Sequence, residues 1–301
     1  MRTVIVIAGP TAIGKTALSI QLAQHFNTSI VSADSRQCYR EMNIGTAKPD
    51  AAELATVTHY FINSHSIHDN INAAGYEQLA LGYLDHIFKT SDVAIVCGGT
   101  GLYIKALCEG IDAMPDVDKN VEAEIRRQFE VNGLPWLQEE LRAKDPVFFE
   151  QAEQQNPVRL IRALSFFETH QSSITDFKTQ TAKERAFRVI KIALDIPREQ
   201  LYARINHRVD LMMEAGLLRE IATLYPFRKL KNLQTVGYSE FYEAGEFPLT
   251  AAQIEVAVDK VKQHTRNYAK RQLTWFRKDQ AFAWFAPDDF NGVLEYIHNK
   301  N

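Results

Sequence analysis

Short apolar runs recur along the chain and alternate with stretches of helical periodicity. Four of them have the length and composition of buried strands, namely TVIVIAG (3–9), SIVSAD (29–34), VAIVCGG (93–99) and FRVIKIALDI (187–196). Strands that alternate with helices predict a parallel α/β sheet flanked by helices. A shorter apolar run, AFAWF (281–285), is expected to add a last strand.

The pattern of apolar residues changes between the third and fourth strands. Over residues 112–183 no run has the composition of a strand. NVEAEIRRQFEVNG (120–133) is typical of a helix that is stopped by Gly133. PVRLIRALSFFETH (157–170) is typical of a helix with Pro157 in its first turn. We therefore expect a mostly helical insertion domain between two strands of one sheet.

The rest of the chain forms the predicted core. Residues 1–111 and 184–301 are assigned to one phosphate-loop α/β domain, and residues 112–183 to the insertion. Beyond the fourth strand, apolar periodicity predicts helices at 199–224 and 252–278.

Composition and charge narrow the classes of protein. Hydrophobic residues are 46% and charged residues 24% of the chain, which is ordinary for a soluble globular enzyme. The net charge of −3 gives no global basic field, so any nucleic acid must be bound by a local patch. Three cysteines without a C-x-x-C pair argue against a disulfide framework or a zinc module. Without a signal peptide or a membrane-spanning run, we expect a cytoplasmic protein, and a monomer because nothing demands a dimer.

The first strand runs into GPTAIGKT, Gly9 to Thr16, which fits the phosphate-cradling pattern G-x-x-x-x-G-K-[ST]. A strand precedes it and a helical pattern follows, which is the context that the motif requires. Gly9 and Gly14 permit the tight curve that points consecutive backbone N–H groups inward. Lys15 supplies a mobile cation, and the Thr16 hydroxyl can ligate Mg²⁺. Most loops of this kind hold ATP or GTP, so nucleotide binding is the first interpretation.

Asp34 ends the second strand, and the ligands of parallel sheets sit at the carboxyl ends of strands. It can hold Mg²⁺ through water or act as a general base, because an ordinary Asp is ionised at neutral pH. The alternative is a helix N-cap, which is compatible with either role. The third strand ends in GGTGLY (98–103), where the Thr100 hydroxyl can contact an anion or a polar substrate edge. Alternatively, these glycines serve only to turn the backbone.

A basic stretch near the end of the chain suits nucleic acid. KQHTRNYAKRQLTWFRK (262–278) has six Lys or Arg residues, no acid, and interleaved aromatic rings. Arg266 and Lys270 share a helical face. Basic residues meet phosphates and flat rings meet unstacked bases. The alternative is a solvated helix face with Trp275 and Phe276 in the core.

A pair of arginines lies in the insertion. Arg159 and Arg162 share one face of the helix expected at 157–170. Two guanidinium groups on one face suit a diphosphate or an RNA backbone. Salt bridges to neighbouring acids are the competing interpretation.

Together these stretches resemble one family. GPTAIGKT, SADSRQCYREMNIGTAKP, GGTGLYIKAL, RLIRAL, LQTVGY and TRNYAKRQLTWFR follow one another over nearly the whole chain. In this order they are similar to the tRNA dimethylallyltransferases, also called tRNA isopentenyltransferases. The DS-x-Q-x-Y…IGTAKP and AKRQ-x-TW-x-R blocks are far more specific than the phosphate loop.

The resemblance implies transfer of a dimethylallyl group from dimethylallyl diphosphate to N6 of the adenosine at position 37 of tRNA, with Mg²⁺ assisting. It implies that Asp34 accepts the proton of the N6 amine and that Thr11, Lys15, Thr100 and Arg159 complete the catalytic set. The insertion is expected to grip the anticodon arm. The residues implied to bind diphosphate are Gly9, Pro10, Thr11, Ala12, Ile13, Gly14, Lys15 and Thr16, the last also at the metal. Those implied to bind tRNA are Asp34, Ser35, Arg36, Gln37, Thr100, Glu122, Arg159, Arg162, Gln234, Gly237, Tyr238, Arg266, Lys270 and Arg271.

Two positions depart from the family pattern. Many relatives carry an Arg where Glu122 aligns, at a position associated with tRNA contact, so a carboxylate there puts that contact in doubt. The IRCVGY block of some relatives is LQTVGY here, with Gln234 in place of an Arg. The zinc-finger extension of the eukaryotic relatives is missing, which favours a bacterial-type enzyme.

Three other functions stay open at this point. A phosphate-loop kinase for a small metabolite would consume ATP, but it has no clear use for the insertion or the basic-aromatic stretch. A relative that prenylates free AMP, ADP or ATP shares the loop, the base and the fold. A non-catalytic RNA-binding protein leaves Asp34 and the phosphate loop unexplained.

Overall fold

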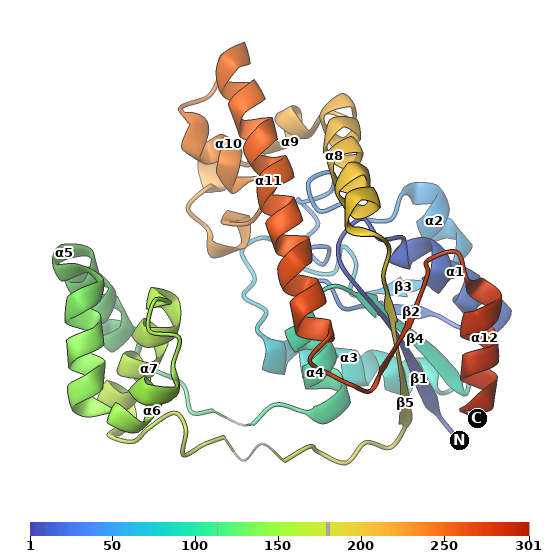
Figure 1. The fold of residues 1–301 in the computed structure, drawn as a ribbon, viewed down its shortest axis with the longest axis horizontal. Coiled ribbons are helices and arrows are strands. Elements are labelled where there is room, and N and C mark those ends of the chain that lie inside the picture. Colours follow the sequence, from blue (N-terminus) through green and yellow to red (C-terminus); the bar gives the residue numbers. More distant parts are fainter. Residues whose placement is uncertain (113, 179–180, 301) are drawn as a thin grey trace. The chain divides into compact units, whose positions relative to one another are not determined.

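A computed structural model describes residues 1–112, 114–178 and 181–300. Its centre is a six-stranded sheet in the order β3-β2-β4-β1-β5-β6, in which all neighbours are parallel (Figure 1). The strands are β1 (Thr3–Ala8), β2 (Ile30–Ser32), β3 (His59–Tyr60), β4 (Val93–Gly98), β5 (Arg188–Leu194) and β6 (Phe282–Phe285). The α/β class and the five strands expected from the sequence are confirmed. Strand β3 was not predicted, because two residues are too few to make an apolar run.

The chain separates into two compact units, residues 1–110 with 184–301 and residues 111–183. These limits differ by one residue from the division expected from the sequence. The helices of the first unit are α1 (Lys15–His25), α2 (Ala51–Thr56), α3 (Ala73–Ile87), α4 (Gly101–Glu109), α8 (Arg198–Glu214), α9 (Leu217–Leu224), α10 (Ser239–Ala244), α11 (Ala251–Phe276) and α12 (Phe290–Asn299), with 3₁₀ turns η1 (Tyr225–Phe227) and η2 (Lys231–Leu233). Those of the second unit are α5 (Lys119–Lys144), α6 (Pro146–Gln151) and α7 (Pro157–His170).

Alternation along the central strand β1 divides the core of the first unit into two layers. Val4, Val6 and Ala8 pack on one face with α3 and α4. Ile5 and Ile7 pack on the other face with α1, α8 and α12. Successive side chains of a strand point to opposite faces, so a strand that is covered on both faces is apolar throughout. This is why β1 reads as a continuous hydrophobic run.

Glycine interrupts two helical stretches. A single helix was expected at 199–224, but α8 and α9 are separate because Gly216 between them has φ of 96°. In α5 the backbone leaves the helix at Gly133, where φ is 74° and ψ is −172°. The helix expected to stop at Gly133 does so, and Pro135 begins the next helical turns. Such positive φ values are accessible to glycine at little cost.

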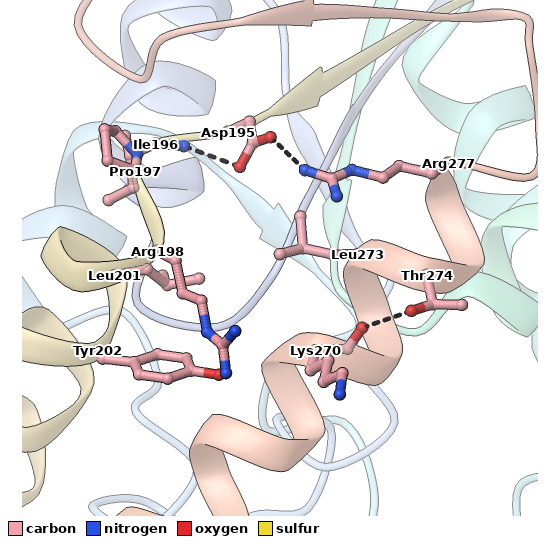
Figure 2. Close-up of a pocket in the computed structure, with 10 residues that line it drawn as sticks. All are labelled: Asp195, Ile196, Pro197, Arg198, Leu201, Tyr202, Lys270, Leu273, Thr274 and Arg277. Atoms are coloured by element: carbon pink, nitrogen blue, oxygen red, sulfur yellow. Dashed lines mark hydrogen bonds and ion pairs between the residues drawn. The ribbon is translucent and has the colours of Figure 1, made fainter.

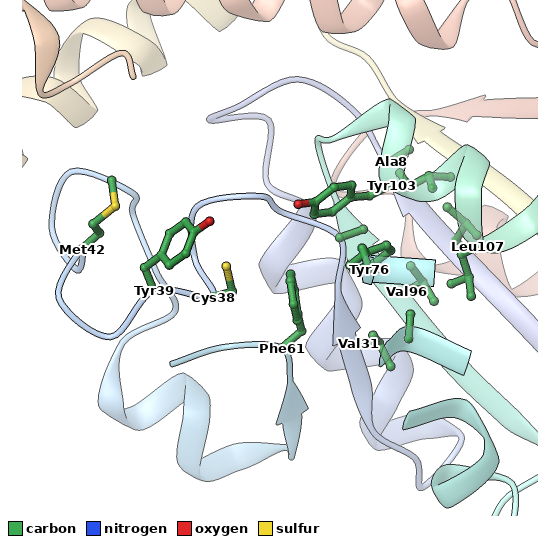
Figure 3. Close-up of a cluster of buried hydrophobic side chains, with 14 of the residues drawn as sticks. Ala8, Val31, Cys38, Tyr39, Met42, Phe61, Tyr76, Val96, Tyr103 and Leu107 are labelled. Atoms are coloured by element: carbon green, nitrogen blue, oxygen red, sulfur yellow. The ribbon is translucent and has the colours of Figure 1, made fainter. Parts of the chain in front are cut away.

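An aromatic cluster supports the loop that follows β2 (Figure 3). The rings of Tyr76 and Tyr103 are stacked with centroids 4.2 Å apart, and Phe61 packs edge-on against both. The Tyr76 hydroxyl donates to the Ser32 carbonyl at 3.0 Å. Large fully buried side chains therefore fix the end of β2, where the candidate base Asp34 begins the following loop.

The insertion unit has a small core of its own. Leu137, Leu141, Leu160 and Phe166 are buried within it. Asn156 caps α7, because its side chain accepts a hydrogen bond from the Arg159 backbone N–H. No helix in the described part of either unit is long and apolar enough to cross a membrane.

Candidate active site

The phosphate loop curves sharply between β1 and α1. Gly9 and Gly14 have φ of 147° and 109°, and Ala12 between them also has a positive φ of 63°. A Cβ on Gly9 would lie 3.2 Å from the carbonyl oxygen of Leu194 on the neighbouring strand. Gly14 precedes α1 and no side chain caps that helix. The first N–H groups of α1 are therefore left for an anion, which the positive end of the helix also favours.

Two cations, Lys15 and Arg208, converge on this loop from different helices. Lys15 Nζ donates to the Pro10 carbonyl at 2.7 Å. Arg208, on α8, donates from Nη1 to Thr11 Oγ1 at 3.2 Å and from Nη2 to the Ala47 carbonyl at 3.5 Å. All of these acceptors are neutral oxygens. Within the described ranges neither cation forms an ion pair with a carboxylate.

Both charges are costly where they lie. Burial lowers the pKa of Lys15 to about 8, with Arg208 acting in the same direction and Asp34 against it. Burial also lowers the pKa of Arg208, again with Asp34 opposing the shift. A lowered pKa means that the surroundings disfavour the positive form. A polyanion bound in the loop would supply the missing counter-charge.

Gln272 of α11 connects the phosphate loop to the turn after β4 through two hydrogen bonds. Its Oε1 accepts from the Thr11 backbone N–H at 2.9 Å, and its Nε2 donates to the Gly99 carbonyl at 2.9 Å. A Cβ on Gly99 would lie 2.2 Å from that Nε2, so a side chain at residue 99 would displace the Gln272 amide from its hydrogen bonds. The side chain is 6% exposed. A buried amide with both ends bonded fixes the spacing of the two turns.

Asp34 is half-buried at the carboxyl end of β2. Its Oδ1 accepts from the backbone N–H groups of Arg36 and Gln37 at 2.8 and 3.2 Å. The cap-like role considered from the sequence is therefore present. Among the described residues Oδ2 has no hydrogen-bond partner, so this oxygen is available to accept a proton from a substrate.

Thr100 and Tyr268 stand beside Asp34. Thr100 Oγ1 accepts from the Ser35 N–H at 3.1 Å, and the Tyr268 side chain of α11 lies near enough for Thr100 and Asp34 to influence its pKa. Burial and the charge of Asp34 raise the pKa of Tyr268 to about 12, while Arg36 and Arg271 oppose the shift. The phenol therefore stays protonated at neutral pH and can act as a hydrogen-bond donor.

The loop that carries Gln37 is held from within. Gln37 Nε2 donates to the carbonyls of Thr46 and Ala47 at 3.2 and 3.0 Å. Lys48 Nζ donates to the Tyr39 carbonyl at 2.5 Å and to Asn63 Oδ1 at 2.6 Å. In this structure these two polar side chains stabilise the loop, and the expected role of Gln37 in tRNA binding stays a prediction.

Glu220 of α9 holds the same loop from outside. Its carboxylate accepts from the backbone N–H groups of Asn43, Ile44 and Gly45 at 2.9, 2.8 and 3.1 Å. The Tyr238 hydroxyl donates to Glu220 Oε1 at 2.6 Å, and the Tyr238 side chain is fully buried. In this structure Tyr238 packs inside the protein and supports Glu220. Its side chain has no exposed surface with which to contact tRNA, so that assignment stays a prediction.

The neighbours of Tyr238 are held in a similar way. Gly237 has φ of 95°, and its N–H donates to the buried carboxylate of Glu240 at 2.9 Å. Gln234 is exposed, and its Nε2 donates to the Arg228 carbonyl at 2.5 Å. Of this predicted block, the Gln234 side chain is the one that lies on the surface.

The basic residues of α11 divide between two surroundings. Arg271 lies 5.7 Å from the centre of the Tyr268 ring, and Tyr268 is also near Asp34. Arg266 donates to Asn206 Oδ1 at 2.7 Å and lies 5.9 Å from the Tyr202 ring. Lys270 is exposed and lines a cavity that also includes Tyr202. The predicted tRNA-binding cations of α11 therefore do not all meet at one point.

That cavity has a volume of about 620 Å³ and lies where β5 leads into α8 (Figure 2). An ion pair between Arg277 and Asp195, 2.7 Å apart, closes one side of it. In Figure 2, Tyr202 of α8 and Lys270 of α11 line the cavity from two different helices. It shares none of its lining residues with the phosphate loop.

The two aromatic residues at the end of α11 differ. Phe276 is buried, as expected if this stretch is a solvated helix face with its rings in the core, whereas Trp275 is 45% exposed. The alternative interpretation, in which both rings lie in the core, is therefore wrong for Trp275. Helical geometry explains the difference, because adjacent positions of a helix point in directions about 100° apart.

The cations predicted in the insertion unit lie on its surface. Arg159 and Arg162 are exposed on α7, and Arg159 comes within 3.9 Å of the Glu153 carboxylate. Glu122 forms an ion pair with Arg126 at 2.5 Å, one turn along α5. The assignments of Arg159, Arg162 and Glu122 to tRNA contact, and of Arg159 to catalysis, stay predictions.

Sequence reasoning missed Arg208 and placed Gln272 and Tyr268 only within a basic stretch. Arg204 and Arg208 are four residues apart in the helix after a core strand, and Arg204 Nη1 donates to the Ile13 carbonyl at 3.2 Å. Two arginines on one helical face at the carboxyl end of a sheet were a usable signal. No local pattern indicated that Gln272 would face the loop.

Comparisons with known proteins agree with this geometry. Residues 37–279 match the family model described as IPP transferase. The chain is 45% identical to a tRNA dimethylallyltransferase of Phocaeicola vulgatus, over 99% of both chains. It is 44% identical to one of Cytophaga hutchinsonii, over 99% of this chain and 97% of the other.

Solved structures agree as well. A tRNA isopentenylpyrophosphate transferase from Bacillus halodurans has a TM-score of 0.71 at 33% identity, covering 100% of this chain and 95% of that chain. A eukaryotic dimethylallyltransferase described as acting on tRNA has a TM-score of 0.77 at 25% identity, covering 97% and 75%. On the family match, the full-length bacterial relatives and the fold, this chain belongs to the tRNA dimethylallyltransferase family.

Proposed function

We propose that this enzyme transfers a dimethylallyl group from dimethylallyl diphosphate to N6 of the adenosine at position 37 of tRNA and releases diphosphate. The observation that carries the proposal is the pair Lys15 and Arg208, two cations held against neutral oxygens at a phosphate loop. The candidate base Asp34 lies close enough to influence both of their pKa values. A polyanionic leaving group and a proton acceptor are thus provided side by side.

The phosphate loop stabilises the leaving group. When C1–O of the donor stretches, positive charge spreads over the allyl unit and negative charge builds on the diphosphate. The N–H groups at the start of α1, Lys15 and Arg208 are arranged before the reaction begins, so they do not have to reorganise. A donor of this kind commonly contributes ~3 kcal/mol to the transition state.

Mg²⁺ fits the same place. The described residues contain no group of three or more His, Cys, Asp or Glu side chains that would hold a metal ion by themselves. Mg²⁺ usually needs only one or two protein ligands when substrate phosphates and water supply the rest. The Thr16 hydroxyl at the start of α1 would be that ligand. When bound, the ion would neutralise charge on the diphosphate.

Asp34 prepares the incoming amine. The N6 lone pair is delocalised into the adenine ring, so the amine is a poor nucleophile until a proton leaves. Oδ1 of Asp34 is engaged with backbone N–H groups, which fixes the carboxylate, and Oδ2 accepts the proton as the C–N bond forms. A positioned base contributes about 10²–10⁴ in rate. Thr100, which accepts from the Ser35 N–H, helps to hold the turn that carries Asp34.

The target adenosine must leave the stack of the anticodon loop to reach Asp34. Extrusion of a base costs a few kcal/mol, which contacts with the rest of the RNA offset. The exposed arginines of α7 and the exposed cations of α11 supply phosphate contacts for this purpose. This is the reason to prefer tRNA over a free adenine nucleotide as the acceptor.

The surroundings suit a cytoplasmic enzyme that acts as a single chain. Cys38, Cys97 and Cys108 are free thiols, as expected in a reducing compartment. The loop, Asp34, Arg208 and Gln272 assemble within one chain, which supports a monomeric enzyme.

One assay tests the function. The protein is incubated with labelled dimethylallyl diphosphate, Mg²⁺ and unmodified tRNA, or with AMP, ADP or ATP instead of tRNA. We expect label in tRNA alone, and none when adenosine 37 is replaced by guanosine. Label in the free nucleotides would favour the nucleotide-prenylating alternative, and ATP consumption without labelled RNA would favour a kinase.

A further inference from the structure

A large aromatic side chain lies exposed beside the candidate active site. Trp275 near the end of α11 is 45% exposed, and Leu102 in the first turn of α4 is 48% exposed. α11 ends next to α4 (Figure 1). Exposed tryptophan is uncommon because its ring is large and apolar. Trp275 and Leu102 leave two large apolar side chains exposed on adjoining helices, and exposed apolar surface that is continuous marks a place where another molecule binds.

The indole rests directly on glycine. A Cβ on Gly101 would lie 2.1 Å from Trp275 Nε1 and 2.2 Å from its Cδ1. A side chain on residue 101 would therefore displace the ring. The absence of a side chain lets the indole lie against the backbone of α4, which fixes its position while much of its surface stays open to solvent.

This position is close to the reacting groups. Gly101 follows Thr100, which is hydrogen-bonded to the N–H of Ser35 next to Asp34. On α11, Trp275 lies one turn beyond Gln272, which bonds to the phosphate loop and to Gly99. An adenine held at Asp34 would therefore have its neighbours in the RNA chain within reach of the indole.

The charges around the indole suit an RNA chain. A cavity of about 400 Å³ is lined by Gly101, Lys105, Trp275 and Lys278. Lys191, Glu109 and Asp279 also line it, and Lys191 neutralises both carboxylates by ion pairs of 2.9 Å to Glu109 and 2.7 Å to Asp279. Lys105 and Lys278 are exposed and have no ion pair within the described part of the chain. An aromatic face between unpaired cations is the arrangement that binds unstacked nucleotides.

We propose that Trp275, seated on Gly101 and flanked by Lys105 and Lys278, is a stacking platform for a nucleobase of the anticodon loop adjacent to the target adenosine. The inference rests on the proposed function. Its role is to hold the neighbouring base so that the target base can enter the site alone. Trp275 is thus a positioning residue for the RNA substrate and makes no contact with the diphosphate.

Steady-state kinetics on an anticodon stem-loop RNA tests the platform in Trp275→Leu and Trp275→Phe. Base–aromatic stacking predicts a KM for RNA roughly tenfold higher in the Leu variant and a smaller rise in the Phe variant. The KM for dimethylallyl diphosphate should not change in either. Val256→Ala, at a 55% exposed apolar position near the other end of α11, is the matched control and should leave both KM values unchanged.

Abasic substitutions identify the base. In the wild type, an abasic nucleotide next to the target adenosine should raise the KM for RNA, and in Trp275→Leu the same substitution should have little further effect. Tryptophan fluorescence should be quenched by the stem-loop in the wild type and not in Trp275→Phe, where Trp136 and Trp284 remain.

Three results would overturn the platform. One is an unchanged KM for RNA in Trp275→Leu, and a second is a rise only in the KM for the donor, which would assign the indole to the dimethylallyl chain. The third is additive effects of the Leu variant and the abasic substitution. In each case the wild type still prenylates the stem-loop. If the wild type does not, the proposed function itself has failed.

Discussion

At the scale of single residues, two positively charged side chains lie where burial disfavours their charged form. Lys15 and Arg208 are partly buried, and the burial of their charged ends lowers the pKa of both. Asp34 opposes these shifts but forms no ion pair with either cation in the described structure. A site that holds uncompensated cations is prepared for an anion, and the electrostatic cost in the free enzyme is relieved when a polyanion binds there.

Asp34→Asn separates the two roles of this side chain. The amide oxygen can still accept from the N–H groups of Arg36 and Gln37, so the turn is kept, while proton acceptance is lost. We expect kcat to fall by about 10²–10⁴. The Kd for tRNA should stay within about threefold, since the lost interaction belongs to the transition state. Near-normal turnover would remove Asp34 as the base.

The pKa of Lys15 predicts how donor binding depends on pH. Because burial lowers this pKa from 10.5 to about 8, the ammonium is charged below pH 8 and loses its proton above it. The KM for dimethylallyl diphosphate should therefore rise between pH 8 and 9.5, by up to about tenfold per pH unit. In Lys15→Arg the guanidinium keeps its charge, so the rise should disappear. A KM that is flat over this range in the wild type would contradict the assignment.

At the scale of elements, the ends of strands and helices create the site. β2 and β4 approach so closely at their carboxyl ends that a Cβ on Gly98 would lie 2.2 Å from the Ala33 carbonyl oxygen. The loop after β2 reaches over and is held at its far side by Glu220 of α9. The strand order thus brings Asp34 and Thr100 together, and the helices α8 and α11 add Arg208 and Gln272 from above the same edge.

Removal of the Glu220 carboxylate should loosen this loop. Glu220→Ala leaves the N–H groups of Asn43, Ile44 and Gly45 and the Tyr238 hydroxyl without their acceptor. We expect the free energy of unfolding in urea to fall by about 2–4 kcal/mol, because hydrogen bonds to charged groups are the stronger ones. Tyr238→Phe removes one of the four bonds and should cost about 1 kcal/mol. Equal losses in the two variants would show that the three bonds from the loop's backbone N–H groups to Glu220 add no stability.

At the scale of the whole molecule, the chain combines a net charge of −3 with an RNA substrate. Long-range attraction to RNA is therefore weak, and affinity must come from local cations whose contacts with phosphate release counterions. The insertion unit offers Arg159 and Arg162 on an exposed helix face, each without a short ion pair in the described structure.

These arginines should set part of the salt dependence of tRNA binding. Each phosphate contact that is lost lowers the slope of log K against log[salt] by about 0.7–0.9. The double variant Arg159→Ala, Arg162→Ala should therefore bind tRNA more weakly and with a shallower slope, measured by filter binding over a salt series. Arg127→Ala is the matched control, because Arg127 is paired with Glu124 on the same unit. An unchanged slope in the double variant would place the RNA elsewhere.

Much of this organisation can be predicted from local patterns. β1 and β4 are apolar throughout because both faces of the sheet are covered, and apolar runs reveal such strands directly. The phosphate loop is equally local, since Gly9 and Gly14 adopt backbone angles that few other residues tolerate. Strand β3 and the helix break at Gly216 are not predicted from the sequence. Two residues are too few to form an apolar run, and a single glycine within a helical pattern does not reliably indicate a break.

The sequence by itself determined the fold class, the phosphate loop, Asp34 at a strand end and the family, because each depends on neighbours along the chain. Only the tertiary structure decided that Arg208 and Gln272 meet the loop, since they lie about two-thirds and nine-tenths of the way along the chain. It also decided that Tyr238 is buried while Trp275 is exposed. The physical reason is that burial and charge compensation depend on distant segments packing together, and no local spacing records that packing.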